Sequence, residues 1–180
     1  MSQLEGILLA DGFTGLTMDE LASRTNCSKA TLYSLAGTKE QLVIAVTKRF
    51  FGRAAEEIEA AVAAEDDARR RIATYLNGVG TAMRRQSPAF YIDMVGFRPT
   101  AEIYQRNSGT AARRVGEMIE DGVRQGVFRP VDGTFAAQLI AMAIDGVQSG
   151  ELLRTTGLSA GDAFAELGDL LLNGLSSHRP

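Results

Sequence analysis

Several residue types are scarce in this chain of 180 residues, which has no tryptophan, one cysteine, one histidine and four prolines. The single cysteine, Cys27, has no partner for an internal disulfide, as is typical of proteins from a reducing compartment such as the cytoplasm. Few prolines and almost no strand-type alternation favour an all-α fold. No apolar run is long enough for a membrane span, and the N-terminus does not resemble a signal peptide. We therefore expect a cytoplasmic, all-α protein without a membrane partner.

The shortage of histidine also limits the possible chemistry. His178 lies in the C-terminal tail, so most metal-ligand sets and histidine-dependent catalytic triads are excluded. Glu56, Glu57 and Glu59 group carboxylates together, but a solvated helix face is the simpler interpretation. Glycine spacings typical of phosphate-binding loops are missing. We expect no enzyme activity, no metal and no cofactor.

Apolar spacing and capping residues predict nine helices. The first is indicated by the stripe of Leu4, Ile7 and Leu8 and ends before Gly12. The predicted helices cover residues 2–10, 18–25, 29–34, 38–64, 68–86, 88–97, 99–125, 132–153 and 159–175. The 99–125 helix is expected to loosen near Ser108 and Gly109, and the tail 176–180 to be irregular. The plan is a three-helix head followed by a six-helix body.

The segment from Thr17 to Leu42 is the most informative part of the chain. Thr17-x-x-Glu20 and Thr38-x-x-Gln41 have the spacing of capping boxes. Asn26 tolerates the left-handed conformation of a sharp turn, and Ser28 is placed to cap the next helix. A helix, a tight turn and a short second helix with polar side chains are typical of a DNA-reading helix-turn-helix.

The net charge of -3 does not exclude a nucleic-acid partner, because charge matters locally. Between Arg24 and Arg49 the basic residues number five and the only acid is Glu40. This segment can present a small positive face to phosphates. The alternative is an ordinary solvated helical surface.

The last two predicted helices are apolar on more than one face, which indicates burial against the body and against a second subunit. The alternative is a fully internal helix pair. The residues expected at the dimer interface are Leu139, Ala143, Gly146, Val147, Gly150, Phe164, Leu167, Leu171 and Leu175.

The head resembles that of the TetR family of bacterial transcriptional regulators. The resemblance rests on Gly12-Phe13, on Thr17 to Ala22, on Ser28 to Tyr33 and on Lys39 to Leu42, and more weakly on Gly126 to Pro130. After Tyr33, where the family commonly has an imidazole and two aromatic residues, this chain has Ser34, Leu35 and Ala36. We also expect no minor-groove contacts from a basic N-terminal arm, and Asn26-Cys27 replaces the usual Gly-Val.

The resemblance implies a homodimer that places one helix of each head in the major groove of a palindromic operator. By this similarity, the DNA-binding residues are Thr17, Ser28, Lys29, Thr31, Tyr33, Ser34 and Lys39. It also implies an effector cavity, for which the aromatic and apolar candidates are Tyr75, Val79, Met83, Phe90, Tyr91, Met94, Phe97 and Tyr104. Core packing is the default role of each cavity candidate taken alone. Asp93 and Arg98 could add charge there.

The expected domains are a DNA-binding head over 1–37 and a ligand-binding and dimerisation domain over 38–180. The expected function is a regulator, most simply a repressor, that a small and mainly apolar effector releases from DNA. A helical dimer whose head binds another protein instead of DNA is the alternative. A small helical enzyme is a third class, which the single histidine disfavours.

Overall fold

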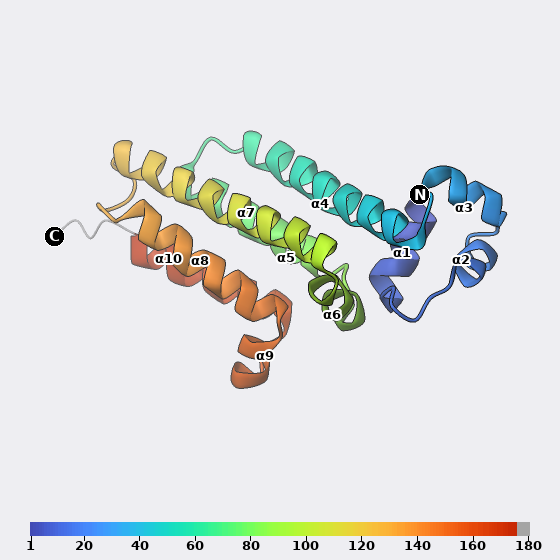
Figure 1. Cartoon of the computed structure of the whole chain (residues 1–180). Coiled ribbons are helices and arrows are strands. Elements are labelled where there is room, and N and C mark those ends of the chain that lie inside the picture. Colours follow the sequence, from blue (N-terminus) through green and yellow to red (C-terminus); the bar gives the residue numbers. More distant parts are fainter. Residues whose placement is uncertain (176–180) are drawn as a thin grey trace. The chain divides into compact units, whose positions relative to one another are not determined.

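The computed structural model describes residues 1–175 and confirms the all-α fold (Figure 1). His178 and the predicted irregular tail lie outside the described residues. The helices are α1 (Ser2–Asp11), α2 (Met18–Arg24), α3 (Lys29–Leu35), α4 (Lys39–Ala63), α5 (Ala68–Met83), α6 (Pro88–Gly96), α7 (Arg98–Arg124), α8 (Gly133–Gln148), α9 (Glu151–Thr156) and α10 (Ala160–Leu175). None of these helices, over the residues described, is long and apolar enough to cross a bilayer.

The helices begin where the capping residues predict. At α2 the Thr17 side chain accepts the amide hydrogen of Glu20, and the Glu20 carboxylate accepts that of Thr17 at 2.7 Å, which completes the capping box. Side chains that cap other helices are Ser28 (α3), Asp67 (α5), Ser87 (α6), Asp132 (α8) and Ser159 (α10). Asn26 has the expected left-handed conformation with φ of 50°. Local hydrogen bonding therefore fixes most helix starts.

The helix predicted over 132–153 is divided, so the described chain has ten helices and not nine. α8 ends at Gln148 and α9 begins at Glu151 after Gly150, which has φ of 75°. A glycine adopts this left-handed conformation at little cost and thereby interrupts the helix. α7, in contrast, is continuous through Ser108 and Gly109.

The chain packs as two compact units. The N-terminal unit contains Met1–Arg53 and Arg85–Gln105, and the C-terminal unit contains Ala54–Arg84 and the chain from Arg106 onward. α6 therefore belongs to the same unit as α1, α2 and α3. The predicted domains at 1–37 and 38–180 describe roles in DNA and ligand binding, and they stay a prediction.

The N-terminal unit is built around aromatic and leucine side chains. Phe13, just after α1, lies edge-on to Phe90 of α6 at 6.0 Å and to Phe97 at 6.3 Å between ring centroids. Such edge-to-face pairs favour a defined orientation of the rings. The largest fully buried side chains of this unit are Leu4, Leu8, Leu21, Leu32, Leu42, Phe50, Phe90 and Met94.

The C-terminal unit has an almost purely apolar core formed by α5, α7, α8 and α10. α10 lies beside both α5 and α8. The close approach of α10 to α5 depends on Gly80, where an added Cβ would lie 3.1 Å from the ring of Phe164. The central side chains of this core are Ile72, Leu76, Val115, Ile119, Ile140, Ile144 and Phe164.

Candidate functional site

The α3 helix presents a polar face to solvent and is anchored by one apolar side chain. Leu32 is 2% exposed and holds the helix in the N-terminal unit, as its apolar character predicts. Lys29, Thr31 and Ser34 are exposed, and Tyr33 is 49% exposed. A tyrosine with an exposed ring and hydroxyl on a short helix can contact a partner both by packing and by hydrogen bonding.

The hydroxyl groups at the start of α3 are already hydrogen-bonded within the helix. The Ser28 Oγ accepts the amide hydrogen of Thr31 at 3.1 Å and lies 2.9 Å from the Thr31 hydroxyl. The Ser34 hydroxyl donates to the Thr31 carbonyl at 2.7 Å. Ser28 therefore acts first as a helix cap. The exposed Lys29 and Tyr33 have the side chains with the greatest reach.

Thr17 is also committed to its own helix. Its hydroxyl donates to Glu20 Oε2 at 2.8 Å. Hydrogen bonds from the Thr17 backbone and side chain hold the pKa of the Glu20 carboxyl below its usual value. The capping box thus orients α2. A DNA contact by the Thr17 hydroxyl would have to compete with its hydrogen bond to Glu20.

Acidic residues of the head partly neutralise its basic residues. Lys29 forms an ion pair with Asp19, and Arg24 pairs with Asp11 at 2.5 Å. The Lys29 and Asp19 side chains are 55% and 65% exposed. Exposed pairs of this kind contribute little to stability, so a phosphate can replace the carboxylate at small cost.

Lys39, at the start of α4, is half-buried and turned toward the α1–α2 turn. Its Nζ donates to the Thr14 carbonyl oxygen at 3.2 Å. A DNA contact by this ammonium would have to compete with that hydrogen bond.

Asp93 of α6 also binds this turn. Asp93 Oδ2 accepts the amide hydrogens of Phe13 at 2.6 Å and Thr14 at 2.8 Å, and Oδ1 accepts the Thr14 hydroxyl at 2.7 Å. Burial alone would raise the pKa of this carboxyl, but the hydrogen bonds from Thr14 and Phe13 and the charge of Lys39 outweigh it and lower the pKa. Gly12 permits this approach, because its φ is +78° and a Cβ would lie 2.6 Å from Asp93 Oδ2.

A groove of about 490 Å³ lies beside this turn within the N-terminal unit. Its walls are Phe13, Thr14, Lys39, Glu40, Val43, Ile92, Asp93, Gly96 and Phe97. Phe97 is the one predicted effector-binding residue among them.

The other predicted effector-binding residues divide between the two units. In the N-terminal unit Phe90 and Met94 are fully buried, and the rings of Tyr91 and Tyr104 meet at 5.9 Å between centroids. In the C-terminal unit Tyr75 and Val79 are buried in the core, and Met83 packs against it. Burial, followed by the nearby Glu59 carboxylate, raises the pKa of Tyr75 to about 12. The Tyr75 hydroxyl therefore stays protonated and able to donate at neutral pH.

The predicted dimer residues also have different environments. Val147, Phe164 and Leu175 are at most 5% exposed and belong to the core of their own unit, so they are poorly placed to contact a partner. Leu167 and Leu171 pack against that core, and Ala143, Gly146 and Gly150 are half-buried. Only Leu139, at 50%, is largely exposed.

The most exposed apolar side chains of the C-terminal unit are not among the predicted dimer residues. Phe135 is 69% and Met142 is 72% exposed on α8, and Leu170 is 70% exposed on α10. The spacing of Phe135, Leu139 and Met142 places them on one helix face. That spacing was visible in the sequence, but it does not distinguish the inner face from the outer face of a helix that is apolar on both.

The Cys27 thiol is half-buried and lies 3.0 Å from the Thr25 hydroxyl. Within residues 1–175, no three histidine, cysteine or acidic side chains are grouped so that they could hold a metal ion.

Comparison with known proteins gives a sequence match for the head and structural matches for the whole chain. Residues 7–46 match the family described as bacterial regulatory proteins, tetR family. No curated protein matches by sequence. A transcriptional regulator from Saccharomonospora viridis, solved in complex with choline, is 18% identical with a TM-score of 0.80 over 98% of this chain and 95% of that one.

Two further solved structures share the fold. A TetR transcription regulator from Haloarcula marismortui is 17% identical, with a TM-score of 0.78 over 98% of this chain and 99% of that one. The fatty acid degradation regulator FadR from Bacillus halodurans is 15% identical, with a TM-score of 0.73 over 95% and 91%. By sequence, residues 7–46 match the TetR family, and the chain shares its fold with a TetR regulator of known structure.

Proposed function

We propose that this protein is a ligand-responsive transcriptional regulator, most simply a repressor, that binds palindromic operator DNA as a homodimer in the cytoplasm. The observation that carries the proposal is the outward face of α3, where Lys29, Thr31 and Tyr33 are exposed while Leu32 anchors the helix. In this proposal residues 1–37 bind DNA, and residues 38–180 bind the effector and the second subunit.

Selection from random DNA followed by footprinting tests the DNA-binding part. We expect a palindromic site whose half-sites are separated by about one helical turn, roughly 34–36 Å, or a multiple of it. Lys29→Ala combined with Tyr33→Ala should abolish most of the affinity. Arg113→Ala, which removes an exposed arginine of α7 in the C-terminal unit, serves as the control. Recovery of no palindromic sequence would refute operator binding.

The dimer part of the proposal is supported by the exposed apolar face of α8 and α10 described above. In the proposed dimer Phe135, Leu139, Met142 and Leu170 contact a second copy of the chain, because exposed apolar side chains grouped on one face mark association surfaces. Sedimentation analysis of Phe135→Ser with Met142→Ser should show a monomer that keeps its helical content. Ile92→Ser, at an equally exposed apolar position of α6, should remain a dimer.

The effector is proposed to be small and mainly apolar, and to lower the affinity for the operator. The support is the aromatic and methionine content of the candidate residues from Tyr75 to Tyr104, which suits an adaptable apolar contact surface. The Saccharomonospora viridis regulator of this fold was solved in complex with choline, which supports a small-molecule effector. A ligand screen read out by operator release tests this step.

One observation favours the protein-interaction alternative. Leu35, which follows Tyr33 and Ser34 on α3, is 47% exposed and offers an apolar contact in place of a polar one. If the head binds another protein, the Lys29→Ala and Tyr33→Ala variant will keep its cellular function and wild type will select no DNA site.

A further inference from the structure

A small polar crevice lies in the C-terminal unit where α4 ends, α5 begins and α7 makes its last turns. Its volume is about 190 Å³, and its walls are Val62, Ala63, Ala68, Arg71, Arg114, Met118, Asp121 and Gln125. At about 30 Å³ per water molecule, this is room for roughly six non-hydrogen atoms.

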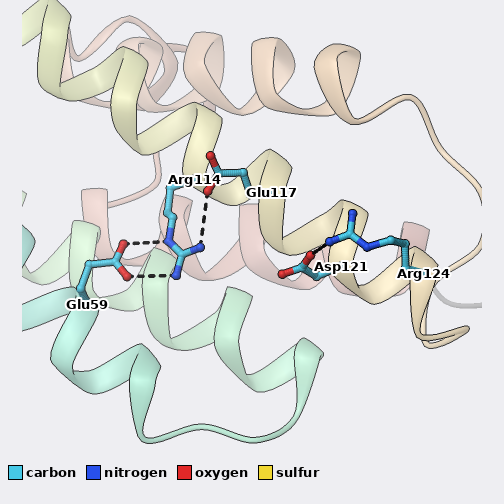
Figure 2. A network of polar contacts seen from close by, with 5 residues as sticks. All are labelled: Glu59, Arg114, Glu117, Asp121 and Arg124. Atoms are coloured by element: carbon cyan, nitrogen blue, oxygen red, sulfur yellow. Dashed lines mark hydrogen bonds and ion pairs between the residues drawn. The ribbon is translucent and has the colours of Figure 1, made fainter.

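Two of the three charged residues of the crevice are already paired. Arg114 binds both oxygens of Glu59 on α4, at 2.9 and 3.1 Å, and its Nη1 lies 3.5 Å from Glu117 Oε2 (Figure 2). Asp121 forms an ion pair with Arg124 one turn further along α7 (Figure 2). Because these charges are compensated, neither residue gives the crevice a net attraction for a ligand of one sign.

Arg71 is the remaining charge, and its side chain is held but not neutralised. Its Nε donates to the Glu65 carbonyl oxygen at 2.7 Å, in the segment between α4 and α5. Among residues 1–175 this is the one polar partner of the guanidinium, and the residue is half-buried. A guanidinium has five N–H donors, and the terminal amino groups of Arg71 are not among the buried unpaired atoms, so a ligand in the crevice can reach them.

We propose that this crevice binds a small oxyanion, a carboxylate or a phosphate, on the terminal amino groups of Arg71. The planar guanidinium fork matches the two oxygens of such a group. The exposed Gln125 carries an amide that can donate a further hydrogen bond. Val62 and Met118 provide an apolar wall for a short hydrocarbon on the same ligand. Binding at this site requires neither DNA nor the proposed effector. The proposal can therefore be tested independently of the proposed function.

The test measures thermal unfolding of the full chain with added acetate, butyrate or phosphate, at ionic strength kept constant with chloride. We expect each bound oxyanion to raise the Tm, because a ligand that binds only the native state stabilises it. Arg71→Gln should weaken binding at least tenfold, and Arg71→Lys should weaken it less because the charge remains. Arg70→Gln is the matched control, since Arg70 is exposed one residue earlier on the same helix.

The ligand series identifies the source of the oxyanion. Tighter binding of butyrate than of acetate would place a hydrocarbon against Val62 and Met118, whereas a response to phosphate alone would indicate an inorganic or phosphorylated ligand. The proposal is overturned if none of these anions raises the Tm above chloride. It is also overturned if Arg70→Gln loses as much binding as Arg71→Gln while both variants keep wild-type helical content.

Discussion

The two compact units differ in the polarity of their buried side chains, because the buried polar residues Glu5, Thr47 and Thr100 all belong to the N-terminal unit. In the N-terminal unit the Glu5 side chain is 4% exposed and meets Arg49, Arg53 and Arg85, at 3.3, 3.7 and 3.7 Å. Asp93 binds the α1–α2 turn with three hydrogen bonds in the same unit. The core of the C-terminal unit, in contrast, consists almost entirely of hydrocarbon side chains.

This difference has physical consequences. Apolar burial is non-directional and insensitive to protonation, so it stabilises a unit without fixing fine geometry. Charged hydrogen bonds are directional and depend on pH, so they can hold a turn and a helix in one orientation. A DNA-reading head needs such orientation, because base and phosphate contacts require defined positions. Regional hydrogen exchange can measure the stability of each unit in the full chain.

Phe164→Ala should give the largest effect and should be confined to the C-terminal unit. Phe164 is 2% exposed and packs on Gly80, so its truncation leaves a cavity and should cost about 3–5 kcal/mol. Amide hydrogen exchange should accelerate most in α5 and α10. After correction for the pH dependence of intrinsic exchange, the increase over wild type should be the same at pH 5 and at pH 7. Asp169→Ala, at an exposed position of α10, should change little. A strong pH dependence would contradict an apolar core.

The local parts of this structure could be predicted from the sequence, and the long-range parts could not. Thr17, Ser28, Ser87 and Asp132 cap helices because each bonds an amide three residues ahead, which sequence spacing reveals. Asp93 binds residues about 80 positions away, and no local pattern indicates where its carboxylate points. Arg98, the other charged candidate, instead pairs with Glu102 on its own helix at 3.0 Å.

The same limit applies to the candidate interface. A helix that is apolar on two faces has the same periodicity whether one face or the other meets the core. Phe164 and Leu175 therefore looked as suitable for a dimer contact as Leu139 did, and only their burial in the core of the C-terminal unit separates them from it. The crevice beside Arg71 could not be predicted either, because its walls come from α4, α5 and α7, which are far apart in the sequence.

Glu5→Gln should give the next largest effect, this time in the N-terminal unit. The substitution keeps the volume but removes the charge that three guanidinium groups share, and we expect a loss of about 2 kcal/mol. The loss stays moderate because the arginine side chains are 38–39% exposed and remain hydrated. Amide hydrogen exchange should accelerate in α1, which carries Glu5, and not in α10. Glu151→Gln removes the exposed pair with Arg154 and should cost less than about 0.5 kcal/mol.

Asp93→Asn should cost about 1 kcal/mol at neutral pH, because the amide keeps one acceptor oxygen but loses the charge. The pKa of Asp93 is lowered in the folded chain, since hydrogen bonds from Thr14 and Phe13 outweigh its burial. Its contribution is therefore complete above the unfolded pKa of about 3.9 and is lost as the pH falls through the lower folded pKa. The acid-induced loss of protection around Phe13 and Thr14 should be smaller in Asp93→Asn than in wild type. An unchanged acid profile would show that Asp93 does not hold the turn in solution.

Lys39→Met should give the smallest effect, about 0.5 kcal/mol, because it removes one hydrogen bond to the exposed Thr14 and keeps an apolar stem. Removing this cation should raise the pKa of Asp93, so the acid-induced loss of protection in the turn should begin at a higher pH than in wild type. Lys48→Met, which removes an exposed lysine of α4, should leave the acid profile unchanged.

Measurement of operator binding distinguishes the two possible roles of Lys39. If the ammonium mainly orients the turn, Lys39→Met will weaken DNA binding with an unchanged salt dependence. If it contacts a phosphate, the slope of log affinity against log salt will fall by about 1. In the first case, the hydrogen bond from Lys39 to the turn contributes to DNA recognition as well as to stability. In the second case, that hydrogen bond contributes to stability alone, and Lys39 acts on DNA directly.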